Sequence, residues 1–154
     1  MFLITSNHRS VPVTHARRGA LEDDLRDHLR AGTGFRMATV NLDHMVQITQ
    51  NDAFARAYAQ QDIIVADGRP IRWLSQLAGA PVDLMPGSDM IVPLARLATE
   101  EDRAIAMIGS TEKALSEAEA HLRRLIPALR VAYRHATAMG FDPDGVGAGP
   151  AERS

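Results

Sequence analysis

The chain contains no cysteine, which excludes a disulfide framework and thiolate chemistry. It has no apolar run near the ~18 residues that a membrane-spanning helix requires. Its opening apolar stretch, Met1 to Ile4, is too short for a signal peptide. The formal net charge is only −2, which argues against nucleic acid as the main partner. These absences favour a cytoplasmic protein.

Several sequence signatures of cofactor and metal sites are also missing. No G-x-G-x-x-G follows an apolar run, which disfavours a dinucleotide-dependent dehydrogenase, and Gly109-Ser110-Thr111 lacks the G-K-[ST] of a P-loop. The histidines show no i, i+4 pair of the kind that binds zinc on a helix. Asp142 and Asp144 form a D-x-D pattern, but they lie in a glycine-rich segment, 142–154, that we expect to be a disordered tail. We therefore expect no metal and no cofactor.

What is present is an alternation of strand and helix patterns along a chain of single-domain length, 154 residues. We expect strands at about 35–40, 62–66, 103–108 and 129–133, and helices at about 21–29, 43–59, 70–79, 88–98 and 111–125. Residues 1–20 give an ambiguous pattern, in which 2–5 is a candidate strand and 11–13 is extended. Because of Pro93, we expect the regular part of the helix over 88–98 to begin a residue or two later. Strand–helix alternation predicts an α/β fold with a mainly parallel open sheet and helices on both faces.

Apolar spacing predicts which helix faces are buried. The helix at 70–79 should pack through Ile71, Leu74, Leu77 and Ala78, with Trp73 also contributing to packing. The helix over 111–125 has the cleanest period, through Leu115, Ala118, Leu122, Leu125 and Ile126.

Polar residues follow two of the expected strands at their carboxyl ends. Thr39 and Asn41 close the first strand, and Asp67-Gly68 follows the next. Ligands of open α/β sheets bind at this edge, so these side chains predict a cleft with an orienting polar pair and a carboxylate base. The simpler alternatives are a helix cap for Asn41 and a turn for Asp67. His44 is close in sequence, and we interpret it as a helix-surface residue.

These segments, in order and at these separations, resemble the WecG/TagA/CpsF glycosyltransferases. The similarity rests on Thr39 to His44, Ile64 to Gly68, Gly87-Ser88-Asp89 and the strand that enters Gly109, and it spans about residues 35–141. The resemblance implies a Rossmann-like domain over residues 1–141. It also implies an inverting, metal-independent transfer of N-acetylmannosamine or a related sugar from a UDP donor. The acceptor would be an undecaprenyl-diphosphate-linked saccharide used for teichoic acid, common antigen or exopolysaccharide.

The resemblance assigns roles to matching residues only. Asp67 matches the catalytic base, and Thr39 and Asn41 match the substrate-binding polar pair. Gly68, Gly109 and Ser110 precede helix N-termini, whose N–H groups suit a diphosphate.

The chain also departs from the family pattern. The family arginine falls on Leu84, for which Arg69 or Arg72 is a candidate substitute. The glutamine-containing segment and the basic membrane appendage that the family pattern has after Phe141 are absent. We therefore expect a chain truncated at its C-terminus, with weak or undetectable transfer and a tendency to form homo-oligomers. Peripheral association with the inner face of the plasma membrane stays open. The alternative function is a non-catalytic nucleotide- or partner-binding module, or an inactive remnant of a transferase.

Overall fold

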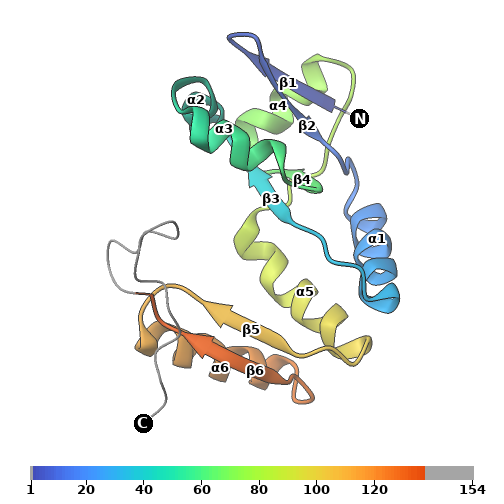
Figure 1. The fold of residues 1–154 in the computed structure, drawn as a ribbon. Helices are drawn as coiled ribbons and strands as arrows, with labels where there is room; N and C mark the ends of the chain where they lie inside the picture. The colour runs from blue at the N-terminus through green and yellow to red at the C-terminus, as the bar shows by residue number, and fades with distance from the viewer. Residues whose placement is uncertain (1, 138–154) are drawn as a thin grey trace. The chain divides into compact units, whose positions relative to one another are not determined.

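The computed structural model describes residues 2–137. The chain divides into two compact units, Met1–Arg103 and Ala104–Ser154 (Figure 1). The first unit contains β1 (Phe2–Ser6), β2 (Arg9–Val13), α1 (Arg18–Ala31), β3 (Met37–Val40), α2 (Leu42–Gln50), α3 (Asp52–Ala59), β4 (Ile63–Ala66), α4 (Arg69–Leu77) and α5 (Gly87–Glu100). The second contains β5 (Ile105–Ile108), α6 (Glu112–Leu125) and β6 (Val131–His135). The predicted α/β class is confirmed, with strands in two-stranded sheets. The predicted tail, with Asp142 and Asp144, lies outside the described residues.

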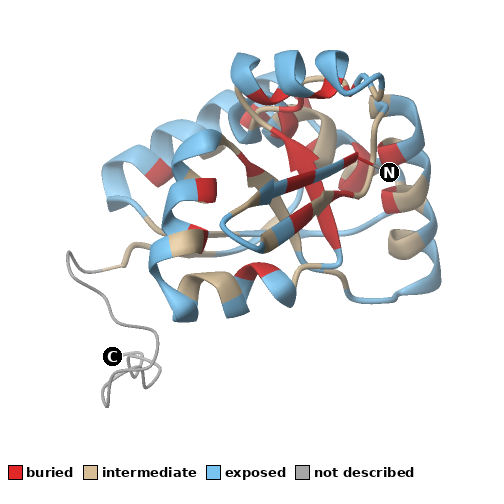
Figure 2. Ribbon diagram, turned by 90° about the horizontal axis from the view of Figure 1, so that it is seen from above, coloured by how far each residue is buried: buried red, intermediate tan, exposed pale blue. Residues whose placement is uncertain are grey.

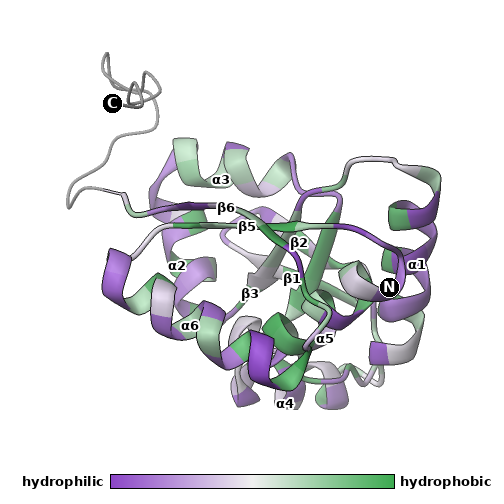
Figure 3. Cartoon of the chain, turned by 90° about the horizontal axis from the view of Figure 1, so that it is seen from below, coloured by the Kyte–Doolittle hydropathy of each residue, from purple (hydrophilic) through white to green (hydrophobic). Residues whose placement is uncertain are grey.

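The centre of the first unit is the parallel pair β3–β4, in which Val40 lies opposite Ala66. All four residues of β4 are buried, as expected for a parallel strand covered on both faces. Ile64 and Ala66 join an apolar cluster with residues of β1, β2, α2, α3 and α4. Ile63 and Val65 join a second cluster with residues of α1 and α5. Buried positions in this unit therefore gather on the strands and on one side of the helices (Figure 2). The helices carry both polar and apolar residues (Figure 3).

The N-terminal strands form an antiparallel hairpin rather than part of the parallel sheet. Its turn residues Asn7 and His8 have φ of 44° and 64°, the positive values that a two-residue hairpin turn uses. After β2, the backbone N–H of Thr14 donates to the carbonyl of Ile64 at 2.9 Å. The backbone N–H of Ile64 donates in return to the Thr14 hydroxyl at 3.0 Å. These bonds hold the hairpin segment on β4.

The helix predicted over 43–59 is two helices, α2 and α3. Asn51 separates them with an extended backbone, and its side chain accepts hydrogen bonds from the N–H groups of Ala53 and Phe54. Asparagine favours this capping role over a helix interior. Pro93, in contrast, lies inside α5, so the predicted later start of that helix is wrong. The proline removes one N–H, the one that would pair with the carbonyl of Asp89 near the helix start, and the remaining bonds hold the helix.

The apolar face predicted for α4 is largely wrong. Ile71 is fully buried, but Trp73, Leu74 and Leu77 are exposed. The buried side instead includes Ser75, whose hydroxyl accepts a hydrogen bond from the N–H of Val82 at 3.2 Å. A single apolar side chain and a hydroxyl therefore form the fully buried contact of this helix.

The second unit pairs β5 and β6 in parallel, and α6 begins at the predicted position. Thr111 caps α6 by accepting from the N–H of Ala114 at 3.2 Å. Leu115, Leu122 and Ile126 are buried, whereas Ala118 and Leu125 are exposed. The buried stripe of α6 is therefore narrower than its sequence period suggests.

Candidate active site

The predicted polar residues of the first unit meet at the carboxyl ends of β3 and β4. The backbone N–H of Asp67 donates to the carbonyl of Val40 at 2.9 Å, one step beyond the paired strand residues. A Cβ built on Gly68 would lie 3.9 Å from the Cβ of Asn41. Asn41, Asp67 and Gly68 are therefore neighbours at one sheet edge, as the sequence predicted.

The N-terminus of α5 reaches the same edge. The N–H of Met85 donates to the carbonyl of Ala66 at 2.8 Å, which fixes the segment that leads into α5. A Cβ on Gly87 would lie 3.6 Å from Cγ2 of Thr39. We call Thr39, Asn41, Asp67, Gly68 and Gly87 the strand-end cluster.

Asn41 fills the capping role that was the simpler alternative. Its Oδ1 accepts a hydrogen bond from the N–H of His44 at 2.9 Å, at the start of α2. The side-chain amide has no hydrogen-bond acceptor within the described part of the chain. Because capping uses only the oxygen, the NH2 group remains a donor for a ligand. The cap and a binding role are therefore compatible.

The carboxylate of Asp67 is half-buried and has no hydrogen bond or ion pair with any side chain among residues 2–137. Its negative charge nevertheless influences the pKa of Tyr58. Burial raises the pKa of Tyr58 to about 12, and the negative charge of Asp67 adds to the rise. An unpaired carboxylate at a strand end is free to accept a proton from a substrate.

Tyr58 and His44 form a polar contact behind the strand-end cluster that sequence reasoning missed. The Tyr58 hydroxyl donates to the main-chain carbonyl of Thr39. His44 Nδ1 lies 3.1 Å from that carbonyl oxygen and 2.7 Å from the Tyr58 hydroxyl. A ring with hydrogen on Nδ1 can donate to either oxygen while the Tyr58 hydroxyl donates to the carbonyl. These contacts hold His44 in place, whereas its position in the sequence suggested a helix-surface residue.

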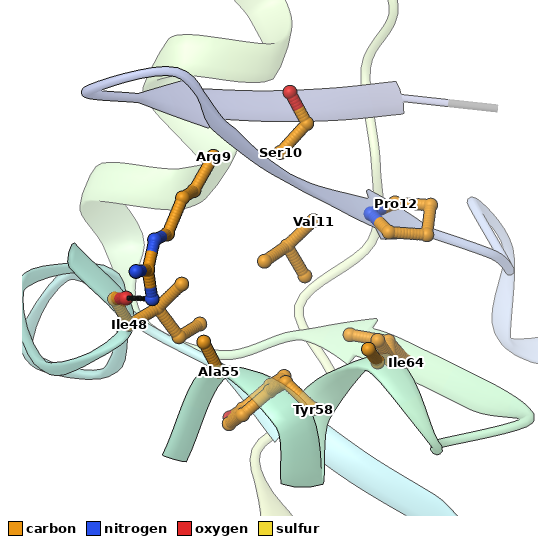
Figure 4. A pocket seen from close by; sticks show the side chains of 9 residues that line it. Arg9, Ser10, Val11, Pro12, Ile48, Ala55, Tyr58 and Ile64 are labelled. Carbon is orange, nitrogen blue, oxygen red and sulfur yellow. Dashed lines mark hydrogen bonds between the residues drawn. The ribbon is translucent and has the colours of Figure 1, made fainter. Parts of the chain in front are cut away.

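The ring of Tyr58 also lines an apolar hollow on its other side. This hollow, of about 220 Å³, lies between β2 and α2–α3 and includes Val11, Ile48 and Ile64. Arg9 extends across it and donates to the carbonyl of Ile48 at 2.6 Å (Figure 4). Tyr58 thus connects the core of the first unit to the backbone of Thr39.

Leu84 faces the two arginines named as candidate substitutes for the missing family arginine. Arg69, Arg72 and Leu84 line one open hollow of about 460 Å³ together with Trp73 and Gln76. Neither arginine has an ion-pair partner among the described residues. The exposed positive charge near Leu84 therefore comes from α4.

Gly109 and Ser110 belong to the second unit, where they follow β5. Their φ values are 108° and 60°, so the chain turns sharply there, and the N–H of Gly109 donates to the carbonyl of His135 at 3.0 Å. Within residues 2–137, no three histidine, aspartate or glutamate side chains gather as a metal site would require.

The described helices include none that is both long enough and apolar enough to cross a bilayer.

A family model described as the glycosyl transferase WecG/TagA/CpsF family matches residues 7–148. No curated protein matches the chain.

Proposed function

Since this chain belongs to the WecG/TagA/CpsF family of glycosyltransferases, which act in cell-surface polysaccharide synthesis, we propose that it transfers an N-acetylmannosamine-type sugar from a UDP donor to a lipid-linked saccharide. The proposal includes inversion at the anomeric carbon and no metal. The observation that carries it is the strand-end cluster, where a carboxylate with no side-chain partner among residues 2–137 adjoins an amide donor and a helix N-terminus.

In this proposal Asp67 is the base. Its carboxylate takes the proton of an acceptor hydroxyl while the hydroxyl oxygen attacks the anomeric carbon. The new glycosidic bond forms as the bond from that carbon to the diphosphate breaks, and UDP leaves with the electron pair. A base of this kind contributes ~10²–10⁴-fold to the rate. Among residues 2–137 no side chain pairs with Asp67, which supports the assignment, because an ion-paired carboxylate would be a weaker base.

The donor diphosphate would be held by backbone and amide N–H groups. Gly68 precedes α4 with φ of 83°, and the missing side chain permits close approach of a ligand to the helix N-terminus. Asn41 would donate through its free amide, and Thr39 through its hydroxyl. We propose Gly109 and Ser110 as further backbone contacts to the substrate.

The test is a transfer assay with the purified chain, labelled UDP-N-acetylmannosamine and a lipid-linked saccharide acceptor. We expect label in the lipid fraction, released UDP and no change on addition of a metal chelator. The competing function is a nucleotide-binding module without turnover. It would be supported by calorimetric binding of UDP with no label transferred to any acceptor in a panel of lipid-linked saccharides.

A further inference from the structure

The solvent face of α4 is unusually apolar for a surface helix. Trp73, Leu74 and Leu77 are exposed by 63%, 43% and 87% of their surfaces. At 100° per residue, Trp73 and Leu77 lie side by side on the outer face, and Leu74 borders them. Three neighbouring large apolar side chains form a patch of the kind that marks an interaction site.

Basic residues adjoin this apolar patch on the same helix. Arg69 and Arg72 are exposed, and with Gln76 they lie on the flank of α4 that faces Leu84. Trp73 lines that hollow too, so it lies between the basic residues and the rest of the apolar patch. Asp83, next to Leu84, forms its hydrogen bonds with the N–H of Arg18 and with Arg17; these bonds lower its pKa, and the charge of Arg72 also lowers it without a direct ion pair. Among residues 2–137 neither Arg69 nor Arg72 forms an ion pair, so both guanidinium groups can bind an external anion.

We propose that this face of α4 docks on an anionic lipid surface. Trp73, Leu74 and Leu77 enter the boundary between headgroups and acyl chains, and Arg69 and Arg72 bind lipid phosphates. Tryptophan and leucine beside arginine on one helix face is the composition of helices that lie in a membrane interface.

Charge favours a lipid surface over a second copy of this chain. A symmetric dimer through α4 would bring the same two arginines of each copy together, and like charges across an interface oppose association. A bilayer rich in phosphate presents the opposite sign to both arginines. Because the whole chain carries a net charge of −2, the attraction must come from this local patch.

Docking through α4 has a consequence that rests on the proposed function. Asp67 lies two residues before the first residue of α4. A docked helix therefore holds the proposed base next to the membrane surface, where the saccharide of a lipid-linked acceptor is found.

Trp73 is the single tryptophan of the chain, so tryptophan fluorescence reports on this face of α4 alone. Its fluorescence can be titrated with vesicles of phosphatidylcholine alone and of phosphatidylcholine with phosphatidylglycerol, without a donor sugar. We expect a shift of emission to shorter wavelength and saturable binding to the anionic vesicles. Two arginines near the surface should make that binding about 30-fold tighter than binding to neutral vesicles.

Matched variants distinguish the contribution of the apolar patch from that of the two arginines. Leu77→Glu should weaken binding about tenfold or more, because one large side chain no longer enters the interface. Arg69→Gln with Arg72→Gln should remove the preference for anionic vesicles. Ile91→Glu and Arg96→Gln, at exposed positions of α5, should leave both properties unchanged.

Three results would overturn the proposal: no change in Trp73 emission with anionic vesicles, equal loss in the α5 controls, or a concentration-dependent dimer that Leu77→Glu abolishes. Calorimetry with UDP in the absence of vesicles tests the proposed function separately. Leu77→Glu should bind UDP as the wild type does, so failure of docking and failure of donor binding are distinguishable.

Discussion

The phenol of Tyr58 on α3 donates its hydrogen bond to the main-chain carbonyl of Thr39, the residue whose side chain belongs to the strand-end cluster. This bond ties a helix to the carboxyl end of β3, and His44 shares the same carbonyl. The polar contact therefore holds the backbone on which Thr39 and Asn41 are placed.

Replacing Tyr58 by phenylalanine should lower the free energy of unfolding by about 0.5–1.5 kcal/mol, the net value of one hydrogen bond. The wild type should also show a pH dependence that the variant lacks. Because the pKa of Tyr58 rises to about 12 on folding, its contribution is present below pH ~10, the ordinary tyrosine value, and is lost as pH rises toward 12. Denaturant unfolding at pH 8 to 11 measures both effects. Tyr133→Phe, at an exposed position, is the control, and equal pH profiles for the two variants would contradict the prediction.

Asn41→Ser should separate capping from ligand binding. Serine caps a helix about as well as asparagine, but it lacks the amide that we assign to the donor. UDP affinity measured by calorimetry should fall about tenfold, the value of a hydrogen bond to a charged group, with an unchanged melting temperature. Asn51→Ser makes the same exchange at the N-cap of α3, away from the strand-end cluster, and should leave UDP affinity unaffected. Equal affinity in the wild type and Asn41→Ser would place the donor elsewhere.

Asp67→Asn should affect rate rather than fold. Asparagine keeps the shape of the side chain and removes its basicity, so sugar transfer should fall by ~10²–10⁴-fold while UDP binding persists. Asp27→Asn, at an exposed position of α1, should transfer at the wild-type rate. A variant at position 67 that retains full activity would exclude this carboxylate as the base.

Leu122→Ala should destabilise the second unit by roughly 2–5 kcal/mol, because the leucine is buried and its loss leaves a cavity. Leu125→Ala is the paired control on the same helix. Leu125 is 45% exposed, so its replacement should cost only about 0.5–1 kcal/mol, near the range of surface substitutions. Thermal unfolding of the two variants checks the difference. Equal costs would mean that the buried stripe of α6 is as broad as its sequence period suggested.

The sequence by itself determined most of the helices, the strands that follow residue 35 and the neighbourhood of the strand-end residues. Apolar runs such as Ile63 to Ala66 predict strands because hydrophobic periodicity is local. Once β3 and β4 are parallel, Asn41 and Asp67 must emerge at the same edge, and no knowledge of packing is needed for that inference. Asn51 carried a capping signal too, but the continuing apolar pattern on both sides of it concealed the break between α2 and α3.

Only the tertiary structure decided which faces are covered and which distant groups meet. Periodicity predicts that α4 has an apolar side, but whether Leu77 is buried depends on what packs against the helix. In the structure the segment at Val82 packs on the side that carries Ser75, and Leu77 stays exposed. The contact of Tyr58 with Thr39 likewise joins residues 19 apart, and its existence follows from how α3 docks on the sheet. Local patterns determine local structure because they depend on neighbouring residues, whereas burial and long-range contacts arise only when the elements are packed together.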